Sequence, residues 1–133
     1  MSYGTNSSRY REMEVLSMSP AQRVVLLYHH LLVNLRQARA HMERGEIEAR
    51  GNRLLRAEEI VHELAVSLDH EAGGEIAGRL AALYAWLLGE FAAVHLHPDS
   101  ERLDSAVRVI SELHEAWTAV AAQAVEPSAT AAG

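Results

Sequence analysis

Four stretches of this sequence repeat apolar residues at steps of three and four, and this repeat constrains the fold more than any other feature. The apolar positions are 21, 24, 28, 31, 35, 38 and 42, then 54, 57, 61, 64 and 68, then 76, 80, 83, 87, 91 and 94, and finally 103, 106, 110, 113, 117, 120 and 124. This spacing places one apolar stripe along each of four helices. Four such helices with short connections predict an all-α fold, an antiparallel four-helix bundle.

Capping and helix-breaking residues predict where the helices begin and end. Ser19 and Gln22 form a capping box around Pro20 at the start of the first helix, and Gly45 ends that helix. The pair Gly73-Gly74 predicts a tight turn between the second and third helices. The predicted helices cover roughly 19–44, 46–70, 74–95 and 100–125.

The same signals divide the chain into three parts. Residues 1–17 are predicted to form a short, flexible N-terminal arm, because they are polar and carry only isolated apolar residues. Residues 18–125 form the bundle, and residues 126–133 are predicted to be a disordered tail of small residues. At 133 residues the chain is long enough for one domain with a genuine core.

The composition excludes several classes of function. The chain has no cysteine, which excludes disulfides, thiolate metal sites and a cysteine nucleophile. The first 56 residues carry nine arginines and five glutamates, whereas the rest carry three arginines and thirteen acids. An acidic half argues against nucleic-acid binding. The longest apolar stretch, Val24–Val33, is too short for a membrane span, and no apolar run of a signal peptide precedes it. We therefore expect a cytoplasmic protein with no membrane insertion.

The histidines and carboxylates do not form a pattern typical of catalysis or metal binding. Glu59 and His62 stand at the three-residue step that di-iron bundles use, but this step occurs only once, and the apolar stripes contain no glutamate. His95 and His97 could share a metal from a loop, yet a histidine near a helix end more often interacts with the helix dipole. The chain also lacks a serine elbow and a glycine-rich phosphate loop. We predict no enzyme activity, no catalytic residue, no metal site and no cofactor.

The third predicted helix has more apolar surface than one stripe requires. Beside its stripe lies a second row, made of Ala77, Ala81, Tyr84 and Leu88. Trp86 lies beyond both rows, and Leu26 is a surplus apolar residue on the first helix. These residues either complete a wide core face or form an exposed groove for a partner's amphipathic helix. Trp117 continues the stripe of the fourth helix, so we predict that Trp117 is core and Trp86 is not.

Motifs along the four helices follow one order and spacing. They are Tyr10-x-x-x-x-Val15-x-Ser17-x-Ser19-Pro20, Leu27-Tyr28-x-x-Leu31-Leu32, Asn52-Arg-Leu54-Leu-Arg56-Ala57, Ile60-Val61-x-Glu63-Leu64, Gly73-Gly74-Glu75-Ile76-Ala77, Leu83-Tyr84 and Glu112-Leu113-x-x-Ala116-Trp117. Together they cover roughly residues 10–120, and in this order they resemble the flagellin-specific export chaperone family FliS.

The resemblance implies a cytoplasmic four-helix bundle that binds the C-terminal region of flagellin and stops it polymerising early. It also implies delivery of flagellin to the flagellar type III export apparatus, through a component of the export gate. In the family the N-terminal arm can lie on the chaperone's own groove, and Tyr10 and Val15 match that role. Taken with the surplus apolar residues, the candidate client-binding residues are Tyr10, Val15, Leu26, Ala77, Ala81, Tyr84, Trp86 and Leu88.

Two other interpretations stay open. The first is a helical adaptor or dimerisation domain that buries its surplus apolar face against a copy of itself, which predicts a homodimer in the absence of client. The second is a metal-binding, ferritin-like bundle, against which the lack of carboxylates in the apolar stripes argues. Light scattering with and without flagellin separates the first interpretation from a chaperone, and metal analysis separates the second.

Overall fold

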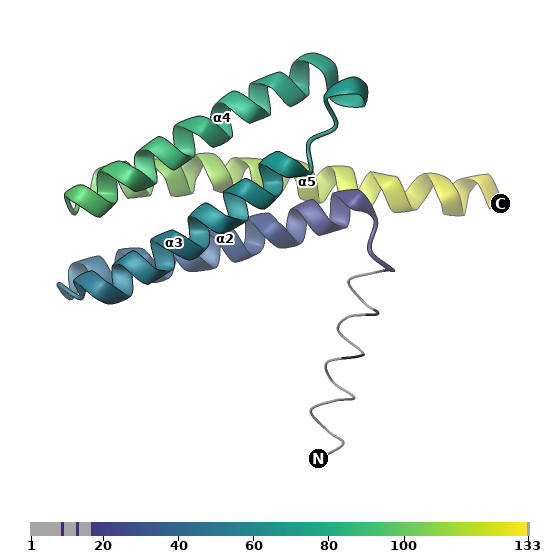
Figure 1. Cartoon of the computed structure of the whole chain (residues 1–133). Coiled ribbons are helices and arrows are strands. Elements are labelled where there is room, and N and C mark those ends of the chain that lie inside the picture. The colour runs from purple at the N-terminus through teal and green to yellow at the C-terminus, as the bar shows by residue number, and fades with distance from the viewer. Residues whose placement is uncertain (1–8, 10–12, 14–16, 133) are drawn as a thin grey trace.

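The computed structural model describes Arg9, Met13 and residues 17–132, with the side chains of the last helix described as far as Gln123. Within these residues four helices form an antiparallel bundle, as the sequence predicts (Figure 1). The helices are α2 (Pro20–Glu43), α3 (Ile47–Val66), α4 (His70–Leu96) and α5 (Ser100–Ala132). Three short connections make each helix antiparallel to the one before it.

The start of α2 has the predicted capping box. The Ser19 hydroxyl accepts a hydrogen bond from the Gln22 backbone N–H at 3.2 Å, and the Gln22 side chain accepts one from the Ser19 N–H at 2.9 Å. Pro20 occupies the first helical position, where it lacks only an N–H that the helix would not use. At the other end Gly45 adopts a φ of 69°, which ends the helix as expected.

The connection between α3 and α4 differs from the predicted one. The predicted break at Gly73-Gly74 is confirmed, because the backbone at Gly74 is not helical, but it is not the turn between α3 and α4, since α3 ends at Val66 and α4 begins at His70. Asp69 caps the new helix by accepting a hydrogen bond from the Ala72 N–H at 3.0 Å. Gly74 lies within α4, with a φ of 51° and a ψ of −121°. The glycine pair therefore separates the first turn of α4 from the rest of the helix.

The core lies between α2, α3 and the inner faces of α4 and α5. α2 packs closely against both α3 and α5, whereas α4 packs mainly against α3 and less against α5. The predicted stripes of α2 and α3 are confirmed at their centres. The largest fully buried side chains are Tyr28, Phe91, Leu31, Leu35, Leu54, Ile60, Leu64, Leu87, Leu103, Ile110, Val61 and Val94.

The core face of α4 is rotated relative to the predicted stripe. Ile76, which the stripe assigns to the core, is 68% exposed, whereas Ala77 and Tyr84 are only 2% and 3% exposed. The row that α4 buries is a regular seven-residue repeat, with alternating steps of three and four. Its positions are 77, 80, 84, 87, 91 and 94. Part of the row interpreted as surplus is therefore core.

α4 has the length and composition of a membrane-spanning helix, with a mean hydropathy of 1.2 over 18 residues. The same test is passed by core helices of bundles, and Leu87 and Phe91 of α4 are fully buried against the other helices. Only 22% of that apolar window is buried within the chain. The helix is therefore a bundle element whose outer face remains unusually apolar.

α5 is longer than predicted. The helix continues to Ala132, whereas the sequence predicts an end near residue 125 and a disordered tail. The segment after Trp117 is rich in alanine, the best helix former, which favours this continuation. Along α5 the predicted stripe is confirmed at Leu103, Ala106 and Ile110, which are fully or almost fully buried. Trp117 itself is partly buried and packs against the core.

Candidate functional site

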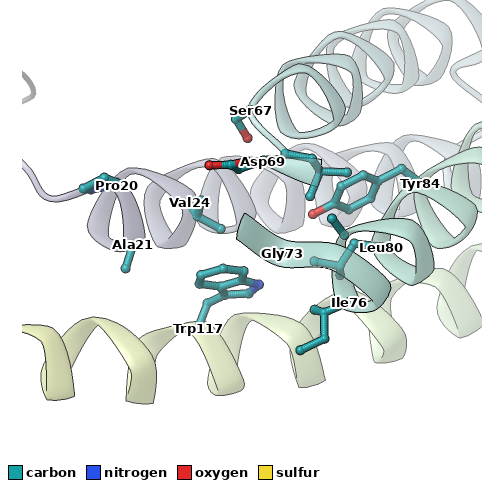
Figure 2. A pocket seen from close by; sticks show the side chains of 12 residues that line it. Pro20, Ala21, Val24, Ser67, Asp69, Gly73, Ile76, Leu80, Tyr84 and Trp117 are labelled. Carbon is teal, nitrogen blue, oxygen red and sulfur yellow. The ribbon is translucent and has the colours of Figure 1, made fainter. Parts of the chain in front are cut away.

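An apolar cavity of about 230 Å³ lies at the end of the bundle where α2 begins and α3 ends. Three helices and one connection contribute side chains to it, and Figure 2 shows them converging from these elements. We call this cavity the end groove. It is lined by Pro20, Ala21, Val24, Ser67, Leu68, Asp69, Gly73, Ile76, Ala77, Leu80, Tyr84 and Trp117.

The kink in α4 opens the end groove. The backbone angles of Gly74 belong to a region that only glycine occupies readily, so the first turn of α4 takes a different direction from the rest of the helix. Figure 1 shows α4 diverging from α5 toward this first turn. The divergence leaves Ile76 and Leu80 of α4 and Trp117 of α5 beside a space that no side chain of the described residues fills.

Almost all of the groove lining is uncharged. The one charged side chain is Asp69, and its Oδ1 already accepts the hydrogen bond that caps α4. A second cavity of about 350 Å³ shares Pro20, Val24 and Ser67 with the end groove. The apolar surface therefore continues around the first turns of α2. Such a surface is suited to apolar side chains of a peptide and not to a charged small molecule.

A buried polar contact lies beneath the end groove. The hydroxyl oxygens of Tyr28 and Tyr84 lie 2.6 Å apart, within hydrogen-bonding distance. Burial, followed by the hydrogen bond to Tyr84, raises the pKa of Tyr28 well above its ordinary value. Burial also raises the pKa of Tyr84. Both phenols are therefore neutral at physiological pH, and their contact ties α2 to α4.

The predicted client-binding residues do not form one surface. Tyr10 and Val15 lie outside the described residues, so their predicted role is untested. Ala77 and Tyr84 are buried, and they border the end groove from its floor. Of the two interpretations of this row, the wide core face holds for Ala77 and Tyr84, because the regular repeat of α4 turns them toward the core.

The other predicted residues lie away from the end groove. Leu26, Ala81 and Leu88 are partly buried, and Leu88 packs against the core. Trp86 is 39% exposed on the outer face of α4, which confirms that it is not a core residue. None of these four residues lines the groove.

Several groove residues were missed. They are Pro20, Ala21, Val24, Leu68, Ile76, Leu80 and Trp117. Most of them belong to the predicted stripes and were therefore interpreted as core. A signal that could have found the groove is Asp69, an N-cap residue that directly follows Leu68, the last residue of the preceding apolar stripe. An N-cap at Asp69 moves the predicted helix connection from Gly73-Gly74 to the residues before His70. The ends of the apolar stripes on either side of that connection are then not covered by another helix.

Two of the residues considered for metal binding lie beside oppositely charged or carboxylate side chains. Glu59 pairs with Arg56 at 2.9 Å, and His95 lies 3.2 Å from Glu58. In the part of the chain that the structure describes, no group of three or more histidines and acids is placed to hold a metal ion.

Comparisons with known proteins agree on one family. A family model described as "Flagellar protein FliS" matches residues 3–124. The flagellar secretion chaperone FliS of Salmonella typhimurium is 32% identical over 114 residues, which cover 85% of this chain and 84% of that protein. FliSB of Pseudomonas aeruginosa is 31% identical over 109 residues, or 82% of this chain and 86% of that one. A crystal structure of a bacterial flagellar chaperone has the same fold, with a TM-score of 0.73 at 16% identity over 87% of this chain and 94% of that chain.

Proposed function

This chain belongs to the FliS family of flagellar proteins, and we propose that it binds the C-terminal region of flagellin in the end groove. The family consists of chaperones and not of enzymes, so the chain is a flagellar export chaperone. The finer proposal is that binding prevents flagellin from polymerising early and that the complex is delivered to the flagellar type III export apparatus in the cytoplasm.

The observation that carries this proposal is the apolar end groove. At about 30 Å³ for each water, its 230 Å³ would hold roughly eight waters, and large apolar side chains of a peptide can displace them. Flagellin segments that fold on binding need such a surface, because an amphipathic helix gains stability by burying its apolar face. The exposed Ile76 at the groove supplies apolar area that the chain itself leaves open.

The direct test is titration of the purified chain with the C-terminal segment of flagellin from the same organism. We expect one segment to bind each chain, with a negative heat-capacity change from apolar burial. A chain that binds no flagellin from its own organism contradicts the proposal.

Two charged variants on one helix test the location. Ile76→Glu places a carboxylate at the groove and should weaken binding at least about tenfold, because a buried carboxylate needs a partner. Leu96→Glu is the matched control, since Leu96 is 78% exposed near the other end of α4 and lines none of the cavities described above. The control should bind within about twofold of the wild type, as surface substitutions usually do. Equal losses of affinity in the two variants would show that the client binds elsewhere.

The later steps need separate measurements. Addition of the chain to polymerising flagellin should delay the rise in light scattering at a stoichiometry of one to one. The complex with flagellin, and less so the free chain, should bind the cytoplasmic domain of an export-gate component. A homodimer remains the alternative partner, and the exposed Trp86 on the apolar outer face of α4 favours it. A dimer that persists after flagellin is added supports that second candidate.

A further inference from the structure

Two tyrosines share a buried hydrogen bond beneath the end groove. Tyr28 is fully buried and does not line the groove, whereas Tyr84 does. The two phenol oxygens are 2.6 Å apart, so one of the hydroxyls donates to the other.

The surroundings of the two hydroxyls decide the direction of donation. If Tyr84 donated to Tyr28, the proton of the fully buried Tyr28 would lie in the core with no acceptor among the described residues. Leaving a buried donor unpaired is costly. If Tyr28 donates to Tyr84, the unpaired proton belongs to the residue that borders the groove. The hydrogen bond with Tyr84 raises the pKa of Tyr28, second to burial, as expected for the donor.

The Tyr84 proton is therefore available at the groove. In the described part of the chain, Tyr28 is the hydrogen-bonding partner of this hydroxyl, and it supplies a donor and no acceptor. Figure 2 shows the Tyr84 hydroxyl pointing toward the interior of the groove, between Asp69 and Trp117. Apart from it, the groove lining near Trp117 is made by aliphatic side chains such as Ile76 and Leu80.

We propose that Tyr84 is a specificity-determining residue that donates a hydrogen bond to a carbonyl oxygen of the flagellin segment bound in the end groove. This inference rests on the proposed function. The carbonyl belongs either to an asparagine or glutamine side chain or to the main chain at the end of a client helix, where carbonyls are unpaired. A segment that fills the groove with apolar atoms alone leaves the Tyr84 proton buried and unpaired, and it binds more weakly.

Two phenylalanine variants test the role of Tyr84. Tyr84→Phe removes the donor to the client, and we expect it to weaken binding of the C-terminal flagellin segment about threefold to tenfold. Tyr28→Phe is the matched control, because it removes the same buried contact but leaves the Tyr84 hydroxyl at the groove. The control should bind within about twofold of the wild type. Circular dichroism of each variant checks that the bundle is folded.

The double variant Tyr28→Phe/Tyr84→Phe covers the case in which Tyr84→Phe alone folds poorly. It leaves no unpaired phenol in the core, and it should show the same loss of affinity as Tyr84→Phe. Replacing each asparagine and glutamine of the segment with leucine then identifies the acceptor. If one replacement gives wild type and Tyr84→Phe the same affinity for the segment, the acceptor is the carbonyl of that side chain. If the difference in affinity survives every replacement, the acceptor is a main-chain carbonyl.

The outcomes separate this inference from the proposed function. If the wild type binds flagellin and Tyr84→Phe or the double variant binds equally well, the inference is overturned while the function stands. Equal losses in Tyr28→Phe and Tyr84→Phe also overturn it, because the contact would then be purely structural. If the wild type binds no flagellin segment, the proposed function fails and the inference fails with it.

Discussion

The hydroxyl oxygens of Tyr28 and Tyr84 lie 2.6 Å apart in the core and connect the middle of α2 to the middle of α4. The contact lies where the tightly packed part of the bundle meets the end groove, since Tyr84 belongs to both. Beyond it, toward the kink at Gly74, α4 departs from its neighbours. The tyrosine contact therefore marks the boundary between the closed part of the bundle and the end groove.

The tyrosine contact should make the bundle sensitive to alkaline pH. Burial raises the pKa of both phenols in the folded chain above the ordinary value of 10.0. The unfolded chain loses these protons first as the pH rises through 10, so the contribution to stability is present below pH 10 and is lost above it. The loss can reach about 1.4 kcal/mol per pH unit for each phenol.

The measurement is the free energy of unfolding in urea at pH values from 8 to about 11. The chain contains no lysine, and arginines stay charged through this range, so the tyrosines dominate the titration. The variant Tyr28→Phe/Tyr84→Phe should have a flatter profile than the wild type. A profile as steep as that of the wild type would show that other groups cause the loss.

The two tryptophans should differ in how much their replacement destabilises the bundle and in how accessible they are to a quencher. Trp117 is partly buried against the core, and Trp117→Ala should lower the free energy of unfolding by about 2–4 kcal/mol, somewhat below the usual value for a fully buried aromatic residue. Trp86 is 39% exposed, and Trp86→Ala should lower it by less than about 1 kcal/mol. Acrylamide quenching of the two single-tryptophan variants checks the accessibility, and equal protection of both side chains would contradict this assignment.

The fold could be predicted because the helical repeat is long and regular. Leu54, Ala57, Val61 and Leu64 of α3 are all buried, and the stripe that contains them has no competing row. The start of α2 was equally predictable, since a capping box is a local interaction that needs no tertiary contact.

The candidate site could not be predicted in the same way, because α4 is apolar on several faces. Two rows one residue apart both satisfy a step of three or four, and only tertiary packing decides that Ala77 and not Ile76 is buried. The groove also depends on a direction change at Gly74, and sequence does not tell whether a glycine pair separates two helices or bends one. The phase of α4 and the position of its first turn therefore decide which apolar residues reach the end groove, and the sequence alone does not fix either of them.

Removal of residues 1–16 should leave the bundle folded. The capping box of Ser19 and Gln22 remains at the start of α2 in the shortened chain, and the core residues all lie beyond it. If the arm competes with the client for the end groove, the deletion should leave the affinity for flagellin unchanged or increase it. Loss of flagellin binding with helicity intact would contradict competition and would indicate that the arm itself contacts the client.

Gly74→Ala should both destabilise the bundle and weaken client binding. The φ of 51° and ψ of −121° at Gly74 are strained for any residue with a Cβ, at a cost of about 1–3 kcal/mol. The variant can relieve this strain only by changing the direction of the first turn of α4, which carries Gly73 and leads into Ile76 at the groove.

The matched control for Gly74→Ala is Gly89→Ala, also on α4. Gly89 has ordinary helical angles, and an added Cβ would meet no atom within 4 Å. The control should therefore raise the free energy of unfolding by about 0.5–1 kcal/mol, because alanine favours a helix over glycine. Thermal unfolding followed by circular dichroism gives both values, and titration with flagellin gives the affinities. If Gly74→Ala is as stable as Gly89→Ala and binds as well, the kink does not shape the groove, and the opening between α4 and α5 must come from side-chain packing alone.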